Sequence, residues 1–214
     1  MTKNKIIVLS RWQGKDNKKI KYEDALIKEL SGYNVSILLI PHIYYLKNNY
    51  SFYKKILKFK GEILICSWLF PRASEWVMNK ELDTSGKKAV KYFSFLKYKK
   101  PGELVSVLKI AVKSEKSGKA LIEDISKIPA VERWYPVVDY SKCRNCKKCL
   151  EFCVFGVYSL GEKKKINVEN PGKCKPGCPA CSRVCPHGAI MFPHYFDDDK
   201  ICGGRPEKNE KKRF

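Results

Sequence analysis

The first 118 residues alternate short apolar runs with segments whose apolar residues recur at helical spacing. The apolar runs predict strands, and the helical spacing predicts helices between them. Runs of this kind are typical of strands that are buried on both faces of a sheet. The strand candidates span residues 5–10, 35–40, 62–66 and 89–95, and the helix candidates span residues 22–30, 50–59, 71–80 and 101–118.

Strands and helices that alternate in this way are typical of βαβ units in a parallel sheet covered on both faces. We therefore expect an N-terminal α/β domain with a small Rossmann-like or flavodoxin-like parallel sheet. Two prolines, Pro129 and Pro136, limit regular structure in the segment that follows. The expected parts are the α/β domain (1–118), a connector (119–136), a second domain rich in Cys, Gly, Pro and Lys (137–205) and a disordered charged tail (206–214).

Eight of the ten cysteines lie between residues 143 and 185. Cysteines packed this closely in an apparently intracellular chain are typical of metal ligands rather than of disulfides. The spacing C-x₂-C-x₂-C-x₃-C of the first run is that of iron–sulfur cluster ligands. Two zinc sites are the alternative, but zinc modules usually separate two C-x₂-C pairs by a dozen or more residues. The two runs are Cys143, Cys146, Cys149 and Cys153, then Cys174, Cys178, Cys181 and Cys185.

The two cysteine runs belong to an internal repeat with a constant offset of 32 residues. The apolar segments 157–160 and 189–192 correspond at the same offset. The repeat predicts a pseudo-two-fold domain made of two loop–helix–strand copies. The matched positions are Cys146 with Cys178, Cys149 with Cys181, Cys153 with Cys185 and Gly156 with Gly188.

Residues 137–193 resemble the bacterial-type 2[4Fe–4S] ferredoxin family, which has an α+β fold. The resemblance implies two [4Fe–4S] clusters with crossed ligand sets, because the fourth cysteine of each run, expected at the start of a helix, serves the other cluster. The expected ligands are Cys143, Cys146, Cys149 and Cys185 for cluster 1, and Cys174, Cys178, Cys181 and Cys153 for cluster 2.

The sequence departs from the family pattern at two places. Val154 follows Cys153, whereas Pro186 follows the equivalent cysteine. Three residues separate Cys174 from Cys178, whereas two separate Cys143 from Cys146. We expect Gly177 to accommodate the extra residue, since glycine adopts tight turns readily. The aromatic lead-in of residues 134–140 gives the whole chain a resemblance to a poorly characterised group of α/β–ferredoxin fusions.

The best candidate for a catalytic site outside the cysteine runs is the segment from Cys66 to Arg72. It follows the third strand candidate, and ligands of open α/β sheets bind beyond the carboxyl ends of strands. In this interpretation Cys66 is a redox-active thiol or an extra ligand, and Arg72 holds an anion; the alternative is that Cys66 is a small buried core residue. The other isolated cysteine, Cys202, is expected to be a bystander in a flexible segment.

The formal net charge is +21, and residues 1–100 contain 21 Lys or Arg against 8 Asp or Glu. An acidic protein, an anionic surface or nucleic acid would suit such a chain, unless the lysines simply cover solvent faces. No nucleic-acid-binding module is recognisable, so nucleic acid ranks last among these partners. No apolar run is long enough to span a membrane and no signal-peptide pattern is present, so a cytoplasmic location is expected.

The leading hypothesis is an electron carrier or oxidoreductase subunit rather than a stand-alone enzyme. It would pass single electrons through the two clusters between donor and acceptor proteins that have an acidic docking surface. A second hypothesis is a redox enzyme with an active site near Cys66 and Arg72 that the clusters supply with electrons. A third is a redox-sensing binding protein that uses a basic surface.

Overall fold

The protein forms two compact units in the computed structural model, which describes residues 5–46, 51–82, 89–112, 118–128 and 132–204. The first unit contains the described residues up to Trp68 and from Val77 to 128. The second unit contains Leu69–Trp76 and the described residues from Glu132 onward. The predicted tail, 206–214, and the predicted end of the last helix, 113–118, lie outside the described residues except for Gly118.

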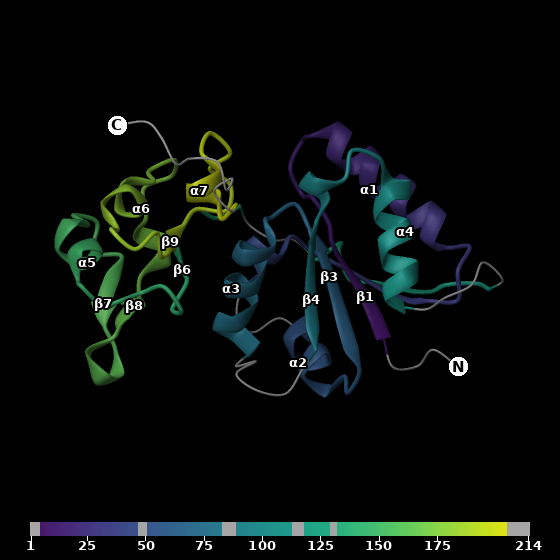
Figure 1. Cartoon of the computed structure of the whole chain (residues 1–214), viewed down its shortest axis with the longest axis horizontal. Helices are drawn as coiled ribbons and strands as arrows, with labels where there is room; N and C mark the ends of the chain where they lie inside the picture. The colour runs from purple at the N-terminus through teal and green to yellow at the C-terminus, as the bar shows by residue number, and fades with distance from the viewer. Residues whose placement is uncertain (1–4, 47–50, 83–88, 113–117, 129–131, 205–214) are drawn as a thin grey trace. The chain divides into compact units, whose positions relative to one another are not determined.

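The first unit is built on a five-stranded, fully parallel sheet (Figure 1). The spatial order is β4-β3-β1-β2-β5. The first four strands therefore have the relative order 2-1-3-4 that flavodoxin-like sheets share. The prediction of an α/β unit with a parallel sheet is confirmed. The strands are β1 (Lys5–Ser10), β2 (Ser36–Ile40), β3 (Glu62–Ser67), β4 (Val90–Ser94) and β5 (Leu121–Asp124).

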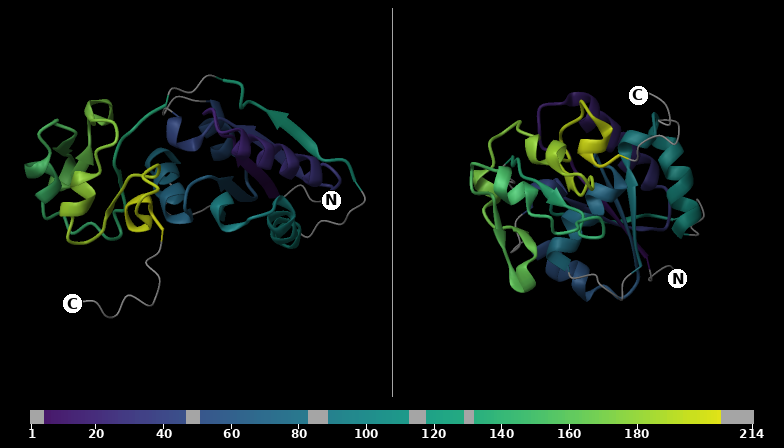
Figure 2. Two further views of the ribbon diagram at one scale, coloured as in Figure 1. Left: turned by 90° about the horizontal axis from the view of Figure 1, so that it is seen from above. Right: turned by 60° about the vertical axis from the view of Figure 1, so that its left-hand side comes forward.

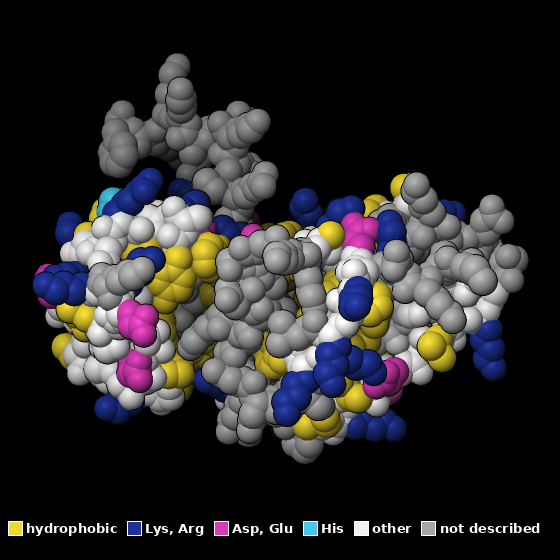
Figure 3. All heavy atoms as spheres, turned by 90° about the horizontal axis from the view of Figure 1, so that it is seen from below, with side chains coloured by type: hydrophobic (Ala, Val, Ile, Leu, Met, Phe, Trp, Pro, Cys, Tyr) yellow, Lys and Arg dark blue, Asp and Glu magenta, His cyan; other side chains and the backbone are white. Residues whose placement is uncertain are grey.

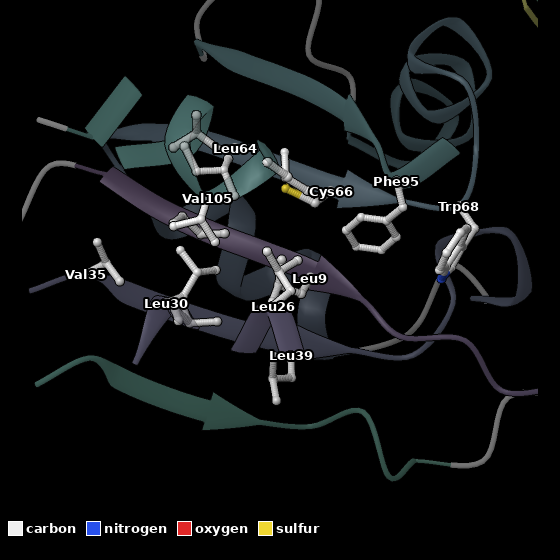
Figure 4. Packing of buried hydrophobic residues seen from close by; sticks show 14 residues of the cluster. Leu9, Leu26, Leu30, Val35, Leu39, Leu64, Cys66, Trp68, Phe95 and Val105 are labelled. Carbon is white, nitrogen blue, oxygen red and sulfur yellow. The ribbon is translucent and has the colours of Figure 1, made fainter. Parts of the chain in front are cut away.

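Helices cover both faces of this sheet (Figure 1). On one face, α1 (Asn17–Leu30) and α4 (Pro101–Val112) pack against alternate residues of the strands, since successive side chains of a strand point to opposite faces. Figure 4 shows this core, in which leucine and valine side chains of the helices meet those of β1, β2 and β3. The remaining helices of the α/β region are α2 (Ser51–Lys58) and α3 (Pro71–Leu82), the latter divided between the two units.

The fifth strand corrects the sequence prediction, because β5 lies in the segment expected to be a connector. It runs along the edge of the sheet beside β2 (Figure 2). Leu121 donates its N–H to Val35 O and Ile125 donates to Leu39 O, each at 2.9 Å. Leu121 is nevertheless 73% exposed. The strand is held by backbone hydrogen bonds rather than by burial, so its hydrophobic pattern did not reveal it.

A buried carboxylate joins the loops that follow β1 and β3. Glu23 of α1 accepts hydrogen bonds from the backbone N–H of Trp12 and from Trp68 Nε1, both at 2.7 Å. Arg11 Nε lies 2.8 Å from its other oxygen. Burial raises the pKa of Glu23, and these hydrogen bonds oppose that shift. The network fixes the carboxyl-terminal edge of the sheet, where two neighbouring strands end.

The second unit is small and contains two antiparallel strand pairs. β6 (Val137–Val138) pairs with β9 (Ile190–Met191), and β7 (Tyr158–Leu160) pairs with β8 (Ile166–Val168). Its short helices are α5 (Lys148–Phe152), α6 (Ala180–Val184) and α7 (Asp199–Cys202). Single 3₁₀ turns in the two units span Ile43–Tyr45, Phe95–Lys97, Glu162–Lys164 and Pro171–Lys173.

The 32-residue repeat is visible in the elements of this unit. The bounds of α5 and α6 differ by 32 residues at both ends, and so do the first residues of β7 and β9. Cys202 lies outside the repeat, at the end of α7, and is fully buried. The expectation of a flexible segment around Cys202 is therefore wrong. None of the described helices combines the length and hydropathy that a membrane span requires.

Replacing Glu23 by alanine should lower the free energy of unfolding of the first unit by about 3 kcal/mol, because Arg11, the buried Trp68 Nε1–H and the partly buried Trp12 N–H lose their acceptor. Denaturant unfolding followed by circular dichroism measures this loss. The matched control is Asp24→Ala, which removes the exposed partner of the same arginine and should cost less than about 1 kcal/mol. Equal losses for the two variants would contradict a structural role for the Glu23 network.

Candidate functional site

The eight clustered cysteines line two separate cavities of the second unit. Each cavity receives three cysteines from one run and the fourth from the other run. The structure thus brings together the two sets that the sequence analysis pairs. The first cavity is lined by Cys143, Cys146, Cys149 and Cys185, and the second by Cys153, Cys174, Cys178 and Cys181.

The exchange of the fourth cysteine depends on the two five-residue helices. Cys153 directly follows α5 and Cys185 directly follows α6. Both were expected at the start of a helix, and the structure shows them at the end of one. Their backbones are extended and nearly identical, with φ −80° and ψ 100° for Cys153 and φ −77° and ψ 107° for Cys185. The backbone at Cys153 is therefore the same as at Cys185, although Val154 replaces proline in the first copy.

The loop before each helix contains a residue in the left-handed region. Asn145 has φ 56° and Gly177, its counterpart in the repeat, has φ 77°. Both loops therefore contain this left-handed residue at the same position of the repeat. The conformation of Gly177 is thus not a consequence of the extra residue between Cys174 and Cys178. Asn145 adopts this conformation because its side chain is anchored: it donates to Lys164 O at 2.5 Å and accepts from Ile166 N at 2.8 Å.

The chemistry of the cavities disfavours free thiolates. Burial raises the pKa of Cys149 to about 11 and the pKa values of Cys174 and Cys181 to about 12. The charges of neighbouring cysteines raise these pKa values further. Cys143 and Cys185 raise the pKa of Cys149, and Cys153 raises the pKa values of Cys174 and Cys181. A positively charged metal group bound at the sulfurs of Cys149, Cys174 and Cys181 would favour their thiolate form.

Hydrogen-bond donors point at the sulfurs from both copies of the repeat. Ala189 N lies 3.4 Å from Cys185 Sγ. The hydroxyl of Tyr158, a buried residue, donates to Cys181 Sγ at 3.0 Å. Donors of this kind stabilise sulfur that carries negative charge, and they tune the potential of a bound group. Four cysteines, apolar walls and these donors together fit an iron–sulfur cluster.

The ligand geometry of a single metal ion can be compared with the described residues. Within the described part of the chain, no three His, Cys, Asp or Glu side chains converge closely enough to hold one ion. A mononuclear zinc site requires four ligand atoms at about 2.0–2.3 Å from one point.

The two cavities differ in the side chains that surround the cysteines. Arg144, Lys147, Lys148 and His187 line the first cavity. The lining of the second contains no charged side chain and includes three exposed apolar residues: Phe152 (50% exposed), Val154 (88%) and Phe155 (40%). The first cavity thus opens among positive charges and the second among apolar side chains.

Arg72 supports the framework of the first cavity. Its Nε donates to Asp139 Oδ2 at 2.7 Å, and its Nη2 donates to Gly188 O at 2.5 Å. The Asp139 backbone accepts from Cys143 N at 3.0 Å and donates to Ala189 O at 2.7 Å. Burial would raise the pKa of Asp139, but hydrogen bonds from Ser141 and Arg72 lower it overall. The guanidinium predicted to hold an anion thus already binds a buried carboxylate.

Cys66 lies in the interior of the first unit. Figure 4 shows its sulfur among aliphatic side chains of the core, and the residue is fully buried. Burial strongly raises the pKa of its thiol. This environment corresponds to the packing alternative considered for Cys66 and offers no activation of the thiol as a nucleophile.

Several supporting residues were missed by sequence reasoning. Tyr158, Asn145 and Asp139 act through contacts with partners distant in the chain, which leave no local pattern. Trp134 was noted only as part of the aromatic lead-in. In the structure its Nε1 donates to Cys178 O at 3.2 Å, and its ring stacks on Phe192 with a centroid distance of 5.2 Å.

Comparison with known proteins gives one informative likeness. The chain is 46% identical over 69 residues to an uncharacterised ferredoxin of Methanocaldococcus jannaschii. The match covers 32% of this chain and 44% of the relative, so less than half of the relative's length is represented. No family model matches the chain. The likeness shows that the chain contains a ferredoxin-like region.

The substitution Arg72→Met should lower the stability of the second unit by about 3 kcal/mol, because it leaves the Asp139 carboxylate buried without its cation. The measurement is anaerobic denaturant unfolding followed by circular dichroism and by release of iron.

Two controls accompany this variant. Arg144→Met removes an exposed cation that has no ion pair among the described residues and should change stability by less than about 0.5 kcal/mol. The double variant Arg72→Met/Asp139→Asn removes the uncompensated charge and should recover part of the loss. A single variant as stable as Arg144→Met would exclude the proposed support.

Proposed function

We propose that the chain is an electron-transfer protein that holds two [4Fe–4S] clusters and passes single electrons between a donor and an acceptor protein. The observation that carries the proposal is the pair of cavities, each lined by four cysteines drawn from both runs. A [4Fe–4S] cluster bound by four thiolates supplies one-electron redox chemistry. The likeness to a ferredoxin supports the same conclusion.

The residues of the chain have three tasks in this function. The cysteines bind, as Cys143, Cys146, Cys149 and Cys185 in one site and Cys153, Cys174, Cys178 and Cys181 in the other. Donors such as Tyr158 O–H and Ala189 N–H stabilise the sulfurs and orient them. The apolar residues that line the second site limit the contact of its thiolates with solvent.

The two sites are expected to have different reduction potentials. Positive side chains near a cluster favour its reduced form and raise its potential. Arg144, Lys147 and Lys148 line only the first cavity. We therefore assign the higher potential to the first site. Two sites of unequal potential in series make one direction of electron transfer favourable.

The competing functions lack a supporting observation of this kind. A redox enzyme centred on Cys66 would need an accessible thiol, and that residue is fully buried. A regulatory binding protein would need a distinct recognition module. An electron carrier requires only the two cysteine-lined cavities and no substrate pocket. This function therefore needs no feature beyond those described for the second unit.

Anaerobic reconstitution should give about 8 iron atoms per chain and two reducible species by EPR spectroscopy. The crossed ligand sets can be tested with four single alanine variants. Cys185→Ala should alter the same EPR signal as Cys146→Ala, and Cys153→Ala should alter the same signal as Cys178→Ala. The matched control is Cys202→Ala, which should leave both signals and the iron content unchanged.

One result would overturn the electron-transfer function, and another would overturn the crossed ligand sets. A protein that binds two zinc ions and gives no reducible signal after reconstitution would remove the electron-transfer function. A Cys185→Ala variant that alters the same signal as Cys178→Ala would show that each run serves its own site.

A further inference from the structure

Six basic residues gather around the first cysteine loop, and we call them the cationic rim: Lys142, Arg144, Lys147, Lys148, Lys164 and Lys165. Arg144, Lys147 and Lys148 line the first cavity itself. Lys142 directly precedes Cys143. All six side chains are exposed except Lys147, which is half-buried.

The last two members of the rim come from the turn between β7 and β8. Asn145 binds this turn to the cysteine loop through its hydrogen bonds with Lys164 O and Ile166 N. Ile166, the residue after Lys165, lines the first cavity. The turn is therefore fixed beside the loop, and its charges add to those of the loop.

The charges of the rim are not neutralised within the protein. Across the ranges that the structure describes, no ion pair involves any of its six members. The carboxylates nearest in sequence are Asp139, which is paired with Arg72, and Glu151 and Glu162, which are both exposed. Six cations outnumber the two exposed carboxylates together with the charge of about −2 on an oxidised cluster bound by four thiolates, which leaves a local excess of positive charge at the first cavity. Such a field attracts and orients an anionic partner.

The rim also surrounds the most accessible of the eight clustered cysteines. Cys146 is exposed, whereas the other seven are half-buried or buried. On the face drawn in Figure 3, Lys and Arg side chains stand in separate groups between apolar and polar atoms. Net charge alone would not select a docking surface, but the coincidence of the rim with Cys146 does.

We propose that the cationic rim is the docking surface for an acidic one-electron redox protein, which exchanges its electron at the exposed edge beside Cys146. This inference rests on the proposed function and assigns one partner class to the first site. In each exchange one side loses one electron and the other gains one, with no bond made or broken. The exposure of Cys146 within the rim favours a redox protein over a nucleic acid, because the partner must supply or accept the electron.

The test uses cytochrome b5, an acidic one-electron haem protein, as the oxidant of the reduced holoprotein in stopped-flow experiments. The variant Arg144→Glu/Lys148→Glu should lower the bimolecular rate constant at low salt by about tenfold or more and should flatten its dependence on salt. The control Lys97→Glu/Lys100→Glu changes the net charge equally at two exposed positions of the first unit and should change the rate constant less than about twofold.

Binding gives a second readout that does not depend on electron transfer. Calorimetric titration with oxidised cytochrome b5 at low salt should detect association with the wild type and the control, and none with the rim variant. Equal effects of the rim and control variants on rate and binding would overturn the docking surface. So would a single-stranded oligonucleotide that binds the rim while cytochrome b5 does not.

Iron content and EPR spectra of every variant separate this inference from the proposed function. If the wild type lacks reducible clusters, the proposed function fails, and the docking inference fails with it. If all variants carry both clusters and the rim variant reacts like the control, only the docking surface is excluded.

Discussion

Neither cysteine loop of the second unit completes its own cavity. Each loop supplies three sulfurs, and the fourth comes from the residue that ends the other copy's five-residue helix. Helices this short are not stable in isolation. The position of Cys153 and Cys185 therefore depends on the whole unit being assembled. Conversely, a group bound by four sulfurs joins two segments about 30 residues apart, so binding and folding of this unit are coupled.

The electrostatics of the unit follow from that arrangement. Thiols that are buried together resist ionisation, as the raised pKa values of Cys149, Cys174 and Cys181 show. The two cavities differ in the side chains that line them. Cations line the first cavity, whereas exposed apolar residues line the second. The two sites thus share one backbone arrangement but differ in the side chains around them. This difference makes the two sites chemically unequal.

The sequence predicted those parts of the molecule whose determinants are local. The bounds of β1 are as expected, because a strand buried on both faces is a continuous apolar run. α1 begins five residues before the expected start, because its first turn is polar and is capped by Asp16, which accepts from Lys18 N and Lys19 N. β5 was missed because an exposed edge strand depends on its neighbour rather than on its own side chains.

The same distinction holds for the site. Cysteine spacing identified the eight residues that line the cavities, since each loop is a local structure. It placed Cys153 and Cys185 at the wrong end of a helix, because spacing alone does not show where a five-residue helix lies. The contact between Arg72 and Asp139 joins residues 67 positions apart and leaves no pattern in either segment. Such contacts require the folded structure.

The role of Arg72 has a consequence for how this protein can be divided. The ferredoxin-like region looks like a separable module, and excision near Glu132 would retain every clustered cysteine. Such a fragment would lack Leu69–Trp76, which belongs to the second unit, and with it the cation that compensates Asp139. The boundary suggested by the cysteines is therefore not the boundary of the compact unit, because a segment of the α/β region, Leu69–Trp76, supplies the cation that its buried carboxylate requires.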